Sequence, residues 1–344
     1  MAPAYNKTIH LVGAQRSNHP WGIENRLIPA FESIGCRVLS TDFRQQRAEL
    51  PQLLNQAADL VLVCKGDNIP PALIRSTPCL TALWYAENVG TPEAVDEPTQ
   101  ARRRELAFNV AAFDFVFTHD QANIEIYRGL GARRVSWLPC VAVNPEVQRK
   151  LQVAKKYDVV FVGSPTPYRQ RQLSELRARG VRVEAPNLWD PAELNRVFNE
   201  SRIVLNVHLS EIPNTETRVG EVLGAGSFLL SERLSSSDLL QEGETYASWP
   251  SGDVDALAQK IRYFLTHEKE REAIAARGHA YAHQHLTFRR LVTALLEQID
   301  FNHLKRIWPS YGLGILFNST GEPTLRLDDY YGAVDRALAQ PPTS

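Results

Sequence analysis

Two short segments of the chain hold side chains that could bind a phosphorylated ligand. In "FVGSPTPYRQR" (residues 161–171), Gly163 and Ser164 follow an apolar run, and Arg169 and Arg171 come a few positions later. The backbone N–H groups of such a turn, with guanidinium groups beside them, suit a pyrophosphate. The alternative is that either arginine lies on the solvated first turn of a helix and binds nothing.

The second segment, "TRVGEVLGAGSFLLSE" (residues 217–232), puts Arg218 and Glu221 at the start of a predicted helix. Gly224 and Gly226 let this helix pack closely or end sharply before the apolar run that follows. A carboxylate in such apolar surroundings is costly unless it is paired. Either Arg218 or the hydroxyl groups of a ligand could supply the partner of Glu221.

Motifs of several other sites are missing from the sequence. It has no G-x-G-x-x-G, G-x-x-x-x-G-K-[ST] or G-x-S-x-G pattern, so the signatures of a dinucleotide site, a P-loop and a hydrolase nucleophile are lacking. The one D-x-D, Asp253 to Asp255, is interpreted as the start of a helix. His279 and His283 share a helix face without the carboxylate of a zinc motif, so we expect packing or surface roles. We predict no metal site and no cofactor.

Composition and charge exclude several classes of partner. The 344 residues carry 38 basic and 39 acidic side chains, a net charge of −1, which gives no electrostatic basis for binding nucleic acid or an anionic membrane. The four cysteines are scattered without a C-x-x-C pair, as is usual in a reducing compartment. No apolar run approaches the roughly 20 residues of a membrane span, and no signal-peptide pattern opens the sequence. We therefore expect a cytoplasmic protein without a transmembrane segment.

The two halves of the sequence share one order of elements. Each contains an apolar run that ends in glycine, then a polar loop, a helical stretch, a second glycine and another strand. This order predicts a right-handed βαβ unit with parallel strands. Continued alternation predicts an α/β fold of two Rossmann-like, doubly wound domains, with ligands beyond the carboxyl ends of the strands, in a cleft. The predicted strands lie within residues 7–14, 36–40, 58–66, 79–88 and 113–120, and within 157–165, 181–185, 201–209 and 226–232.

The domain boundary is expected in a polar segment after Pro139. We assign residues 1–147 to the first Rossmann-like domain, 148–300 to the second, and 301–344 to a tail that packs back on the body. The end of the second domain has long helical periodicity. Its apolar face contains Leu257, Ile261, Phe264 and Leu265.

Segments of the second half follow the order seen in CgeB-like glycosyltransferases, a family of GT-B architecture named after a spore-maturation protein. They are "YDVVFVGSPTPYRQRQLSEL", "SRIVLNVHLS" with "TRVGEVLGAGSFLLSE", "EGETYASW", "DVDALAQKIRYFL" and "HLTFRRLV". The first half, with "FDFVFTHDQANIEIYRGLGARRVSWLPCVAVNP", resembles the family's amino-terminal domain more loosely. The resemblance extends over about residues 5–295 and implies the GT-B fold.

The resemblance also implies roles for individual residues. In GT-B enzymes the corresponding helix carries a glutamate that hydrogen-bonds the ribose hydroxyls of a nucleotide-sugar, which implies that role for Glu221. The helix start would then face the diphosphate, with Arg218 beside it and Gly224 at the place of a small residue of the family. One departure is Pro213, which stands eight positions before Glu221, where many retaining GT-B enzymes have a second glutamate. The retaining or inverting outcome therefore stays open.

Together these features predict a metal-independent glycosyltransferase. It would move a sugar from a nucleotide-diphosphate-sugar donor to an acceptor held by the first domain, whether a protein, a glycan or a small molecule. Around the departing diphosphate we place Gly163, Ser164, Arg169 and Arg171, since arginines and helix amino termini can stabilise its charge. Two alternatives remain: a GT-B-type sugar-nucleotide epimerase, which needs no acceptor, and a non-catalytic sugar-nucleotide-binding or assembly protein.

An inverting transfer also needs a general base within hydrogen-bond reach of the acceptor hydroxyl. The first domain offers Asp120 at the end of "FDFVFTHD", His19 in the loop "RSNHPWG" and Glu87 after "CLTALWY". Each candidate has a structural alternative. Asp120 can cap the next helix, His19 can line its loop and Glu87 can be solvated.

Overall fold

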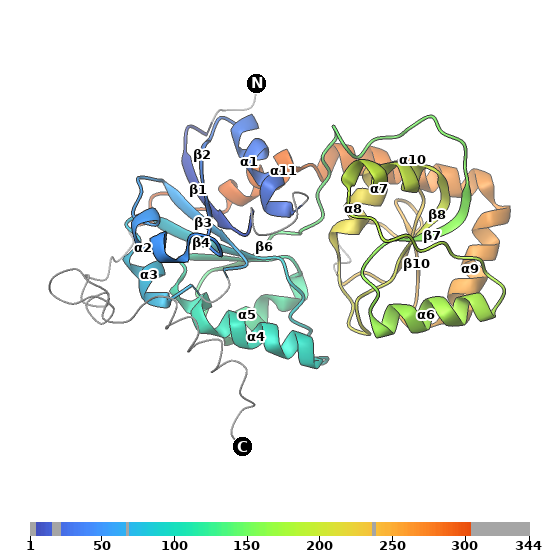
Figure 1. Ribbon diagram of the computed structural model, residues 1–344, viewed down its shortest axis with the longest axis horizontal. Helices are drawn as coiled ribbons and strands as arrows, with labels where there is room; N and C mark the ends of the chain where they lie inside the picture. The colour runs from blue at the N-terminus through green and yellow to red at the C-terminus, as the bar shows by residue number, and fades with distance from the viewer. Residues whose placement is uncertain (1–4, 16–21, 67–68, 236–238, 304–344) are drawn as a thin grey trace, which may run out of the picture. The chain divides into compact units, whose positions relative to one another are not determined.

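The computed structural model describes residues 5–15, 22–66, 69–235 and 239–303, and the chain divides into two compact units (Figure 1). Unit 1 runs to Leu138 and resumes at Val292, whereas unit 2 is the continuous stretch Pro139–Leu291. The sequence-based boundaries, after residues 147 and 300, each lie nine residues beyond those of the compact units. Apart from residues 301–303, the expected tail lies outside the described residues.

Unit 1 contains a six-stranded parallel sheet with the order β2-β1-β3-β4-β5-β6. All residues of β3 and β4 are buried, as in strands covered by helices on both faces. The strands predicted in the first half are all present, and only the three-residue β6 was missed. The strands are β1 (Thr8–Gly13), β2 (Arg37–Asp42), β3 (Leu60–Cys64), β4 (Leu80–Tyr85), β5 (Phe115–Thr118) and β6 (Val135–Trp137).

The helices of unit 1 connect these strands. The longest, α4, starts at a capping box in which Asp96 accepts from the backbone N–H of Thr99 and the Thr99 hydroxyl accepts from that of Asp96. The described helices are α1 (Ile23–Ser33), α2 (Leu50–Leu53), α3 (Pro71–Ser76), α4 (Glu97–Asn109) and α5 (Ile124–Gly129). Short 3₁₀ turns occupy Arg47–Glu49, Val110–Ala112 and Gln121–Asn123.

Unit 2 contains a four-stranded parallel sheet with the order β10-β9-β8-β7. The strand expected within residues 181–185 is wrong in extent, because this segment makes only one bridge to β7, between Glu184 and Val160. Pro186 explains the interruption, since it lacks the N–H that the next ladder bond needs. The strands are β7 (Tyr157–Phe161), β8 (Ser201–Asn206), β9 (Leu229–Glu232) and the unpredicted β10 (Ala247–Trp249).

The helices of unit 2 cover both faces of its sheet. α6 packs with α9 on one face, and α8 packs with α7 and α10 on the other (Figure 1). The long periodic stretch at the end of the second domain forms three helices, and the predicted apolar face of α9 enters the core of unit 2. The helices are α6 (Pro167–Ala178), α7 (Pro191–Asn199), α8 (Thr217–Gly224), α9 (Val254–Thr266), α10 (Glu268–His285) and α11 (Phe288–Glu297), in which the chain returns to unit 1.

Each sheet has one point at which the strand connections reverse direction. In unit 1 it lies between β1 and β3, and in unit 2 between β7 and β8, because α6 leads outward to Glu184 whereas α8 leads to β9. Open parallel sheets bind ligands outside the carboxyl ends of the strands at such a switch point. The topology therefore directs attention to the residues that follow Phe161 and Asn206 in unit 2, and Gly13 and Cys64 in unit 1.

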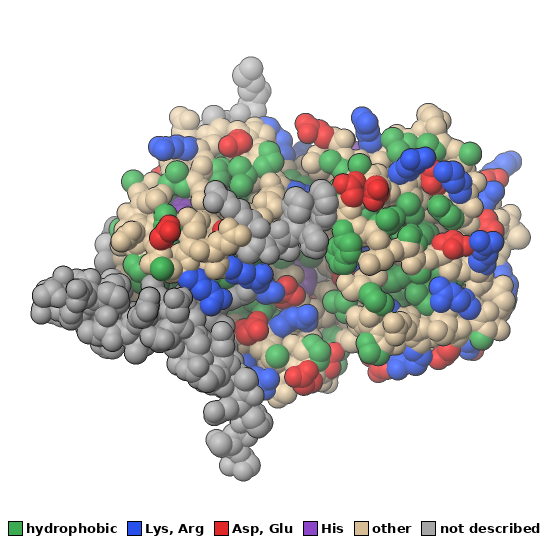
Figure 2. Space-filling view, in the orientation of Figure 1, with side chains coloured by type: hydrophobic (Ala, Val, Ile, Leu, Met, Phe, Trp, Pro, Cys, Tyr) green, Lys and Arg blue, Asp and Glu red, His purple; other side chains and the backbone are tan. Residues whose placement is uncertain are grey.

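The described surface has no strongly charged face in the view of Figure 2, where acidic and basic side chains are interspersed. None of the described helices is long and apolar enough to cross a bilayer.

Candidate functional site

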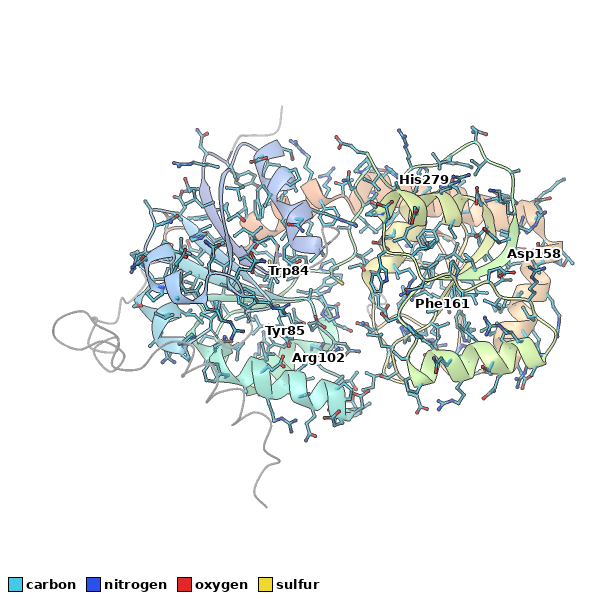
Figure 3. The ribbon with its side chains drawn as sticks, viewed as in Figure 1. Trp84, Tyr85, Arg102, Asp158, Phe161 and His279 are labelled. Carbon is cyan, nitrogen blue, oxygen red and sulfur yellow. The ribbon has the colours of Figure 1, made fainter. Side chains whose placement is uncertain are left out.

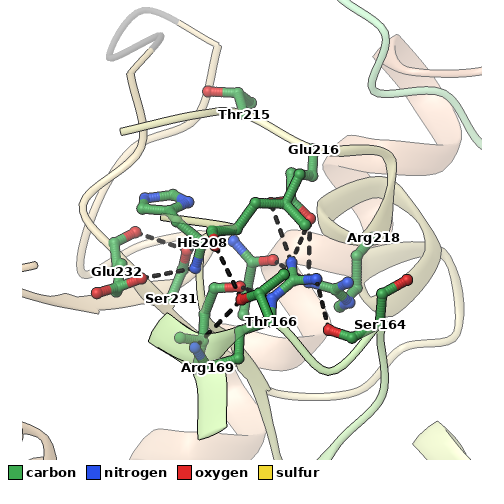
Figure 4. A network of polar contacts seen from close by, with 12 residues as sticks. Ser164, Thr166, Arg169, His208, Thr215, Glu216, Arg218, Ser231 and Glu232 are labelled. Carbon is green, nitrogen blue, oxygen red and sulfur yellow. Dashed lines mark hydrogen bonds and ion pairs between the residues drawn. The ribbon is translucent and has the colours of Figure 1, made fainter. Parts of the chain in front are cut away.

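Arg169, Glu216 and Arg218 form a charged cluster at the switch point of unit 2 (Figure 4). Arg169 lies in the first turn of α6, Glu216 immediately precedes α8, and Arg218 is in its first turn. Arg169 Nη2 donates to both carboxylate oxygens of Glu216, at 2.9 and 3.1 Å. Arg218 Nη1 donates to Glu216 Oε2 at 3.2 Å. One carboxylate thus holds guanidinium groups from two helices.

Arg169 is enclosed by the protein. Its Nε donates to the carbonyl oxygen of Val207 at 2.9 Å and its Nη1 to that of Ser164 at 3.2 Å, and its side chain is only 2 % exposed. Burial lowers the pKa of Arg169 to about 10 although Glu216 opposes this, so the side chain stays charged at neutral pH. All three guanidinium nitrogens are engaged within the protein. Arg169 therefore braces the loops after β7 and β8. Its predicted contact with a ligand stays a prediction.

Arg218 keeps donors that the protein does not use. Its Nη1 bonds both Glu216 and the side-chain oxygen of Asn206, the latter at 2.8 Å. Within the described part of the chain, neither Nε nor Nη2 has a recorded acceptor. The guanidinium also lies over the ring of Phe161, 5.2 Å from its centroid, at the end of β7 (Figure 3). Arg218 is thus a fixed, 11 % exposed cation with free N–H groups.

Gly163 allows the backbone after β7 to approach Arg218. A Cβ at this position would lie 2.4 Å from Arg218 Nη2, a separation that real Cβ atoms do not reach. The turn at Gly163 and Ser164 therefore lies directly beside the unused Nη2. This juxtaposition of a backbone turn and a guanidinium is the arrangement expected for an anion site.

A second buried network fixes the ends of β8 and β9. Glu232, which is fully buried, accepts from the backbone N–H of His208 at 2.6 Å and from the Tyr168 hydroxyl. The side-chain amide of Asn206 donates to Ser231 Oγ at 2.9 Å, which turns its oxygen toward Arg218. The orientation of Arg218 is thus determined from two sides, by Glu216 and by Asn206.

A cavity of about 240 Å³ adjoins this cluster. It lies on the outer side of β7 and is bounded by α6 and the segment around Pro186. Its lining includes Phe161, Gly163, Arg169, Leu173 and Ala185. A mainly apolar cavity next to an anion-binding turn suits a flat organic group attached to a phosphate.

The remaining residues predicted to bind the donor are Glu221, Gly224 and Arg171. Glu221 is partly exposed on α8, one turn after Arg218. Arg218, which the sequence offered as a partner of Glu221, bonds Glu216 and Asn206. Gly224 packs closely, since a Cβ there would lie 2.7 Å from Gln148 Cβ. Arg171 is 52 % exposed and pairs with the exposed Glu211, an interaction worth little in water.

The candidate bases of the first domain differ in their partners. Asp120 is buried and caps the turn Gln121–Asn123, where it accepts from the N–H of Ala122 at 3.1 Å, the structural role named as its alternative. Glu87 lies between Lys65 Nζ at 3.2 Å and Arg102 Nε at 3.5 Å. His19 lies outside the described residues. Glu87 and Asp120 follow the neighbouring strands β4 and β5, and burial, then the charges of both, raise the pKa of Tyr127.

Sequence reasoning missed Glu216 and Asn206, which orient Arg218. Glu216 stands where a helix start usually has Ser, Thr, Asp or Asn, and its side chain makes no capping bond. An acidic residue at that place, two positions before a basic one, was the available signal. Asn206 had a weaker one, as a polar residue at the end of an apolar strand.

The interpretations of the D-x-D and of the histidine pair are confirmed. Asp253 caps α9 by accepting from the N–H of Ala256 at 2.9 Å, and Asp255 pairs with Arg179. His279 and His283 bond the carbonyl oxygens of Leu223 and Gly224 at the end of α8. Among residues 5–303 with their undescribed gaps, no three His, Cys, Asp or Glu side chains gather as metal ligands would.

Comparison with known structures identifies the fold as GT-B. HepE from Anabaena, solved in complex with UDP and glucose, has a TM-score of 0.62 at 13 % identity, covering 85 % of this chain and 99 % of HepE. Sucrose-phosphate synthase from Thermosynechococcus elongatus gives 0.60 at 11 %, covering 85 % and 98 %. The lipopolysaccharide outer core galactosyltransferase WaaB gives 0.55 at 12 %, covering 85 % and 100 %. The predicted fold class is therefore confirmed.

Comparison with protein families concerns the second half of the chain. Residues 146–297 match the family described as glycosyl transferase-like. No curated protein matches the sequence significantly. The match includes the whole cluster of Arg169, Glu216 and Arg218. The segment that carries the candidate site is thus similar to glycosyl transferases, in agreement with the predicted enzyme class.

Proposed function

We propose that the chain is a glycosyltransferase whose unit 2 binds a nucleoside-diphosphate sugar, with UDP-sugars as the first donors to test. The glycosyl transferase-like domain and the fold support this class. HepE has been solved with UDP and with UDP-glucose, which suggests uridine as the base. The sugar would pass to the hydroxyl group of an acceptor bound by unit 1.

The observation that carries the proposal is the position of Arg218. Its unused Nη2 lies beside the backbone turn at Gly163, at the switch point where a parallel sheet binds ligands. A diphosphate placed there would accept from Arg218 and from backbone N–H groups of the turn. The same contacts would stabilise the negative charge that grows on the diphosphate as the glycosidic bond to it breaks.

Arg169 has a different part in this proposal from the one suggested by the sequence. Because it is fully engaged with Glu216 and two carbonyl groups, it would act by holding Glu216, which in turn holds Arg218. Arg171 is too exposed to contribute more than a distant charge. Glu221 keeps its proposed contact to the ribose, and the cavity beside Gly163 would take the base.

The proposed transfer needs no metal ion and no cofactor. Arg218 and the amino-terminal ends of α6 and α8 would supply the positive potential that a metal supplies elsewhere. We further propose that the chain belongs to the CgeB-like group of GT-B enzymes and acts in the cytoplasm. Its acceptor would be a protein, a glycan or a small molecule.

Binding of nucleotides to the full chain tests the donor site. Titration calorimetry with UDP, GDP and ADP should show binding of one of them, with the Arg218→Met variant weakened. Release of UDP from UDP-glucose, with and without added alcohols, then separates transfer from epimerisation and from binding alone. If no nucleoside diphosphate binds, the proposed function is wrong.

A further inference from the structure

Unit 1 has a switch point of its own, between β1 and β3, and the site in unit 2 leaves it without a role. Three charged residues follow neighbouring strands at this edge. Glu24 lies in the first turn of α1 after β1, Lys65 comes directly after β3, and Glu87 comes two residues after β4. By the same topological rule, this edge is where unit 1 should bind a ligand.

The side chain of Glu24 is buried against the end of β1. The residue is 7 % exposed, and a Cβ on Gly13 would lie 2.9 Å from its Cγ. The carboxyl accepts a hydrogen bond from its own backbone N–H, and across the described ranges no other residue bonds or pairs with it. A carboxylate can accept several hydrogen bonds, so a ligand is the further partner to expect at a ligand-binding edge.

The backbone at Lys65 is strained. Its φ of 66° is left-handed, a conformation that residues other than glycine rarely adopt. The buried Asn109 of α4 holds this turn through bonds from Nδ2 to the carbonyl oxygens of Gly66, at 3.2 Å, and Ile69, at 3.1 Å. Strain that the surroundings impose in this way is concentrated at functional sites.

Ion pairs connect Lys65 to a second helix. Lys65 Nζ lies 3.2 Å from Glu87, which in turn lies 3.5 Å from Arg102 Nε. Figure 3 shows Arg102 on α4, below Tyr85 at the end of β4. The pairs fix the ammonium group of Lys65 at this edge.

Burial favours the protonated form of Glu24. Burial raises the pKa of Glu24 above its ordinary value, the bond to its own backbone N–H and the charges of Lys65 and Arg44 lower it, and Glu87 raises it. Cys64, at the end of β3, is a further titratable group near Glu24 among the described residues, and burial followed by Glu24 raises the pKa of its thiol. The net effect is a carboxyl group that takes up a proton more readily than an exposed glutamate.

We propose that Glu24 is the general base of the transfer, accepting a hydrogen bond from the acceptor hydroxyl and taking its proton as the new glycosidic bond forms. This inference rests on the proposed function. The hydroxyl oxygen bonds to the anomeric carbon of the sugar, and the bond from that carbon to the diphosphate breaks with its electron pair leaving on the diphosphate. The proton goes to Glu24 and then to water.

The surroundings indicate a neutral hydroxyl group as the ligand of Glu24. An ammonium group would have to approach Lys65 and Arg44, whose like charges already act on this carboxyl. A carboxylate or phosphate would be repelled by Glu24 itself. Glu24 thereby joins Asp120, His19 and Glu87 as a fourth candidate. Among the described candidates, it alone is buried at the switch point with no bond to another residue's side chain.

The first arm of the test measures turnover by the full chain. UDP release from UDP-glucose, with water or methanol as the hydroxyl donor, should fall by about 10²–10⁴-fold in Glu24→Gln. Calorimetry should show unchanged UDP affinity in that variant. Glu32→Gln, an exposed change on the same helix, is the matched control and should keep full turnover. Equal turnover of Glu24→Gln and wild type overturns the inference but not the donor site.

The second arm measures the proton on Glu24 directly. Carbon-13 NMR of labelled carboxyl groups, with the signal assigned by its loss in Glu24→Gln, should give a pKa above that of an ordinary glutamate. Lys65→Met should raise this pKa further and Glu87→Gln should lower it, because the two charges act in opposite senses. The inflection of turnover against pH should move with them. A normal pKa, or one that neither change moves, overturns the inference even if UDP-glucose is no substrate.

Stereochemistry gives a third outcome. Direct attack by a hydroxyl whose proton goes to a protein base proceeds from the side opposite the leaving group and inverts the anomeric carbon. Methanol and UDP-α-glucose should therefore give methyl β-glucoside, identified by its anomeric proton coupling. The α product would overturn the assignment of Glu24 as base.

Discussion

The carboxylate of Glu216 and the guanidinium of Arg218, two positions apart in the chain, are joined by an ion pair of 3.2 Å that fixes Nη1 and leaves Nη2 beside the turn at Gly163. The pair is 11–13 % exposed, so water screens it only in part. The structure thus presents one oriented cation at the carboxyl edge of the sheet, and the predictions below depend on it.

Three arginine-to-methionine changes should differ in their effects on UDP affinity and on the stability of the fold. Arg218→Met removes a charged donor to the diphosphate, so UDP affinity should fall by about 1.5–3 kcal/mol, or roughly 10- to 100-fold, in a folded protein. Arg169→Met leaves Glu216 short of a partner in a buried place and should destabilise the fold by about 3 kcal/mol or more. Arg171→Met should change neither. Calorimetry and urea unfolding distinguish the three, and a stable Arg169→Met protein would contradict the bracing role.

Gly163→Ala should act through Arg218. The added methyl group would lie 2.4 Å from Nη2, so the guanidinium must move away from the turn. We expect weaker UDP binding and some loss of stability, since Gly163 has a φ of 158°, which residues with a side chain rarely adopt. Gly129→Ala, at a position with no atom within 4 Å of the new Cβ, is the control. Unchanged affinity in Gly163→Ala would remove Nη2 from the site.

Glu221→Gln should weaken nucleotide binding by about 1–3 kcal/mol, as expected for the loss of a charged hydrogen bond to ribose hydroxyls. The neutral amide keeps the shape of the side chain, so the melting temperature without ligand should hardly change. Comparison of UDP with 2′-deoxy-UDP sharpens the measurement, because only the wild type should discriminate between them. Full affinity in the variant would make Glu221 a structural residue.

Glu216 should make the stability of the protein depend on acid pH. Burial by itself raises the pKa of this carboxyl, but the charges of Arg218 and Arg169 outweigh it and hold the pKa below its ordinary value of 4.5. A lowered pKa contributes stability above pH 4.5 that is lost as the pH falls through the folded-state value. Glu216→Gln should therefore be less stable than wild type at pH 7, and the gap should narrow below about pH 4.5. Urea unfolding at several pH values measures this gap, and a constant gap would show that the charge of Glu216 does not matter.

Transfer should continue in excess chelator. Asp253 and Asp255 of the D-x-D serve a helix start and a surface ion pair, so neither is arranged to hold a metal ion against a diphosphate. UDP release from UDP-glucose, measured with EDTA and with added Mg²⁺ or Mn²⁺, checks this. Activity that disappears with EDTA and returns with either ion would contradict the proposed mechanism.

The fold could be predicted from sequence because its signals are local and repeated. A strand such as Leu60–Cys64, buried on both faces, appears as an uninterrupted apolar run, and glycine marks the turn after β1 and β7. The strand β6 has only three residues, and the segment at Glu184 makes a single bridge. Such short elements show too little hydrophobic pattern for their presence or their ends to be predicted. The extent of β6 depends on its pairing with β5, and that of the second segment on Pro186.

The site was predictable only in part, because burial cannot be read from residue type. Arg169 and Arg218 both stand near predicted helix starts, and nothing in the sequence shows that one is enclosed while the other keeps free donors. That difference depends on Val207, 38 positions from Arg169, and on Asn206, 12 positions from Arg218, and both meet their arginine only after folding. Glu24 was not predicted because its burial against the end of β1 is a property of the folded chain.

The return of the chain to unit 1 at Val292 bears on how such proteins can be recombined. Every residue of the proposed donor site lies inside the unbroken stretch Pro139–Leu291, so a single genetic cassette carries donor choice. Unit 1 is encoded in two pieces that flank it. A gene fusion at one junction would therefore leave unit 1 incomplete, and exchanging donors between related proteins should need two crossovers, one on each side of the cassette.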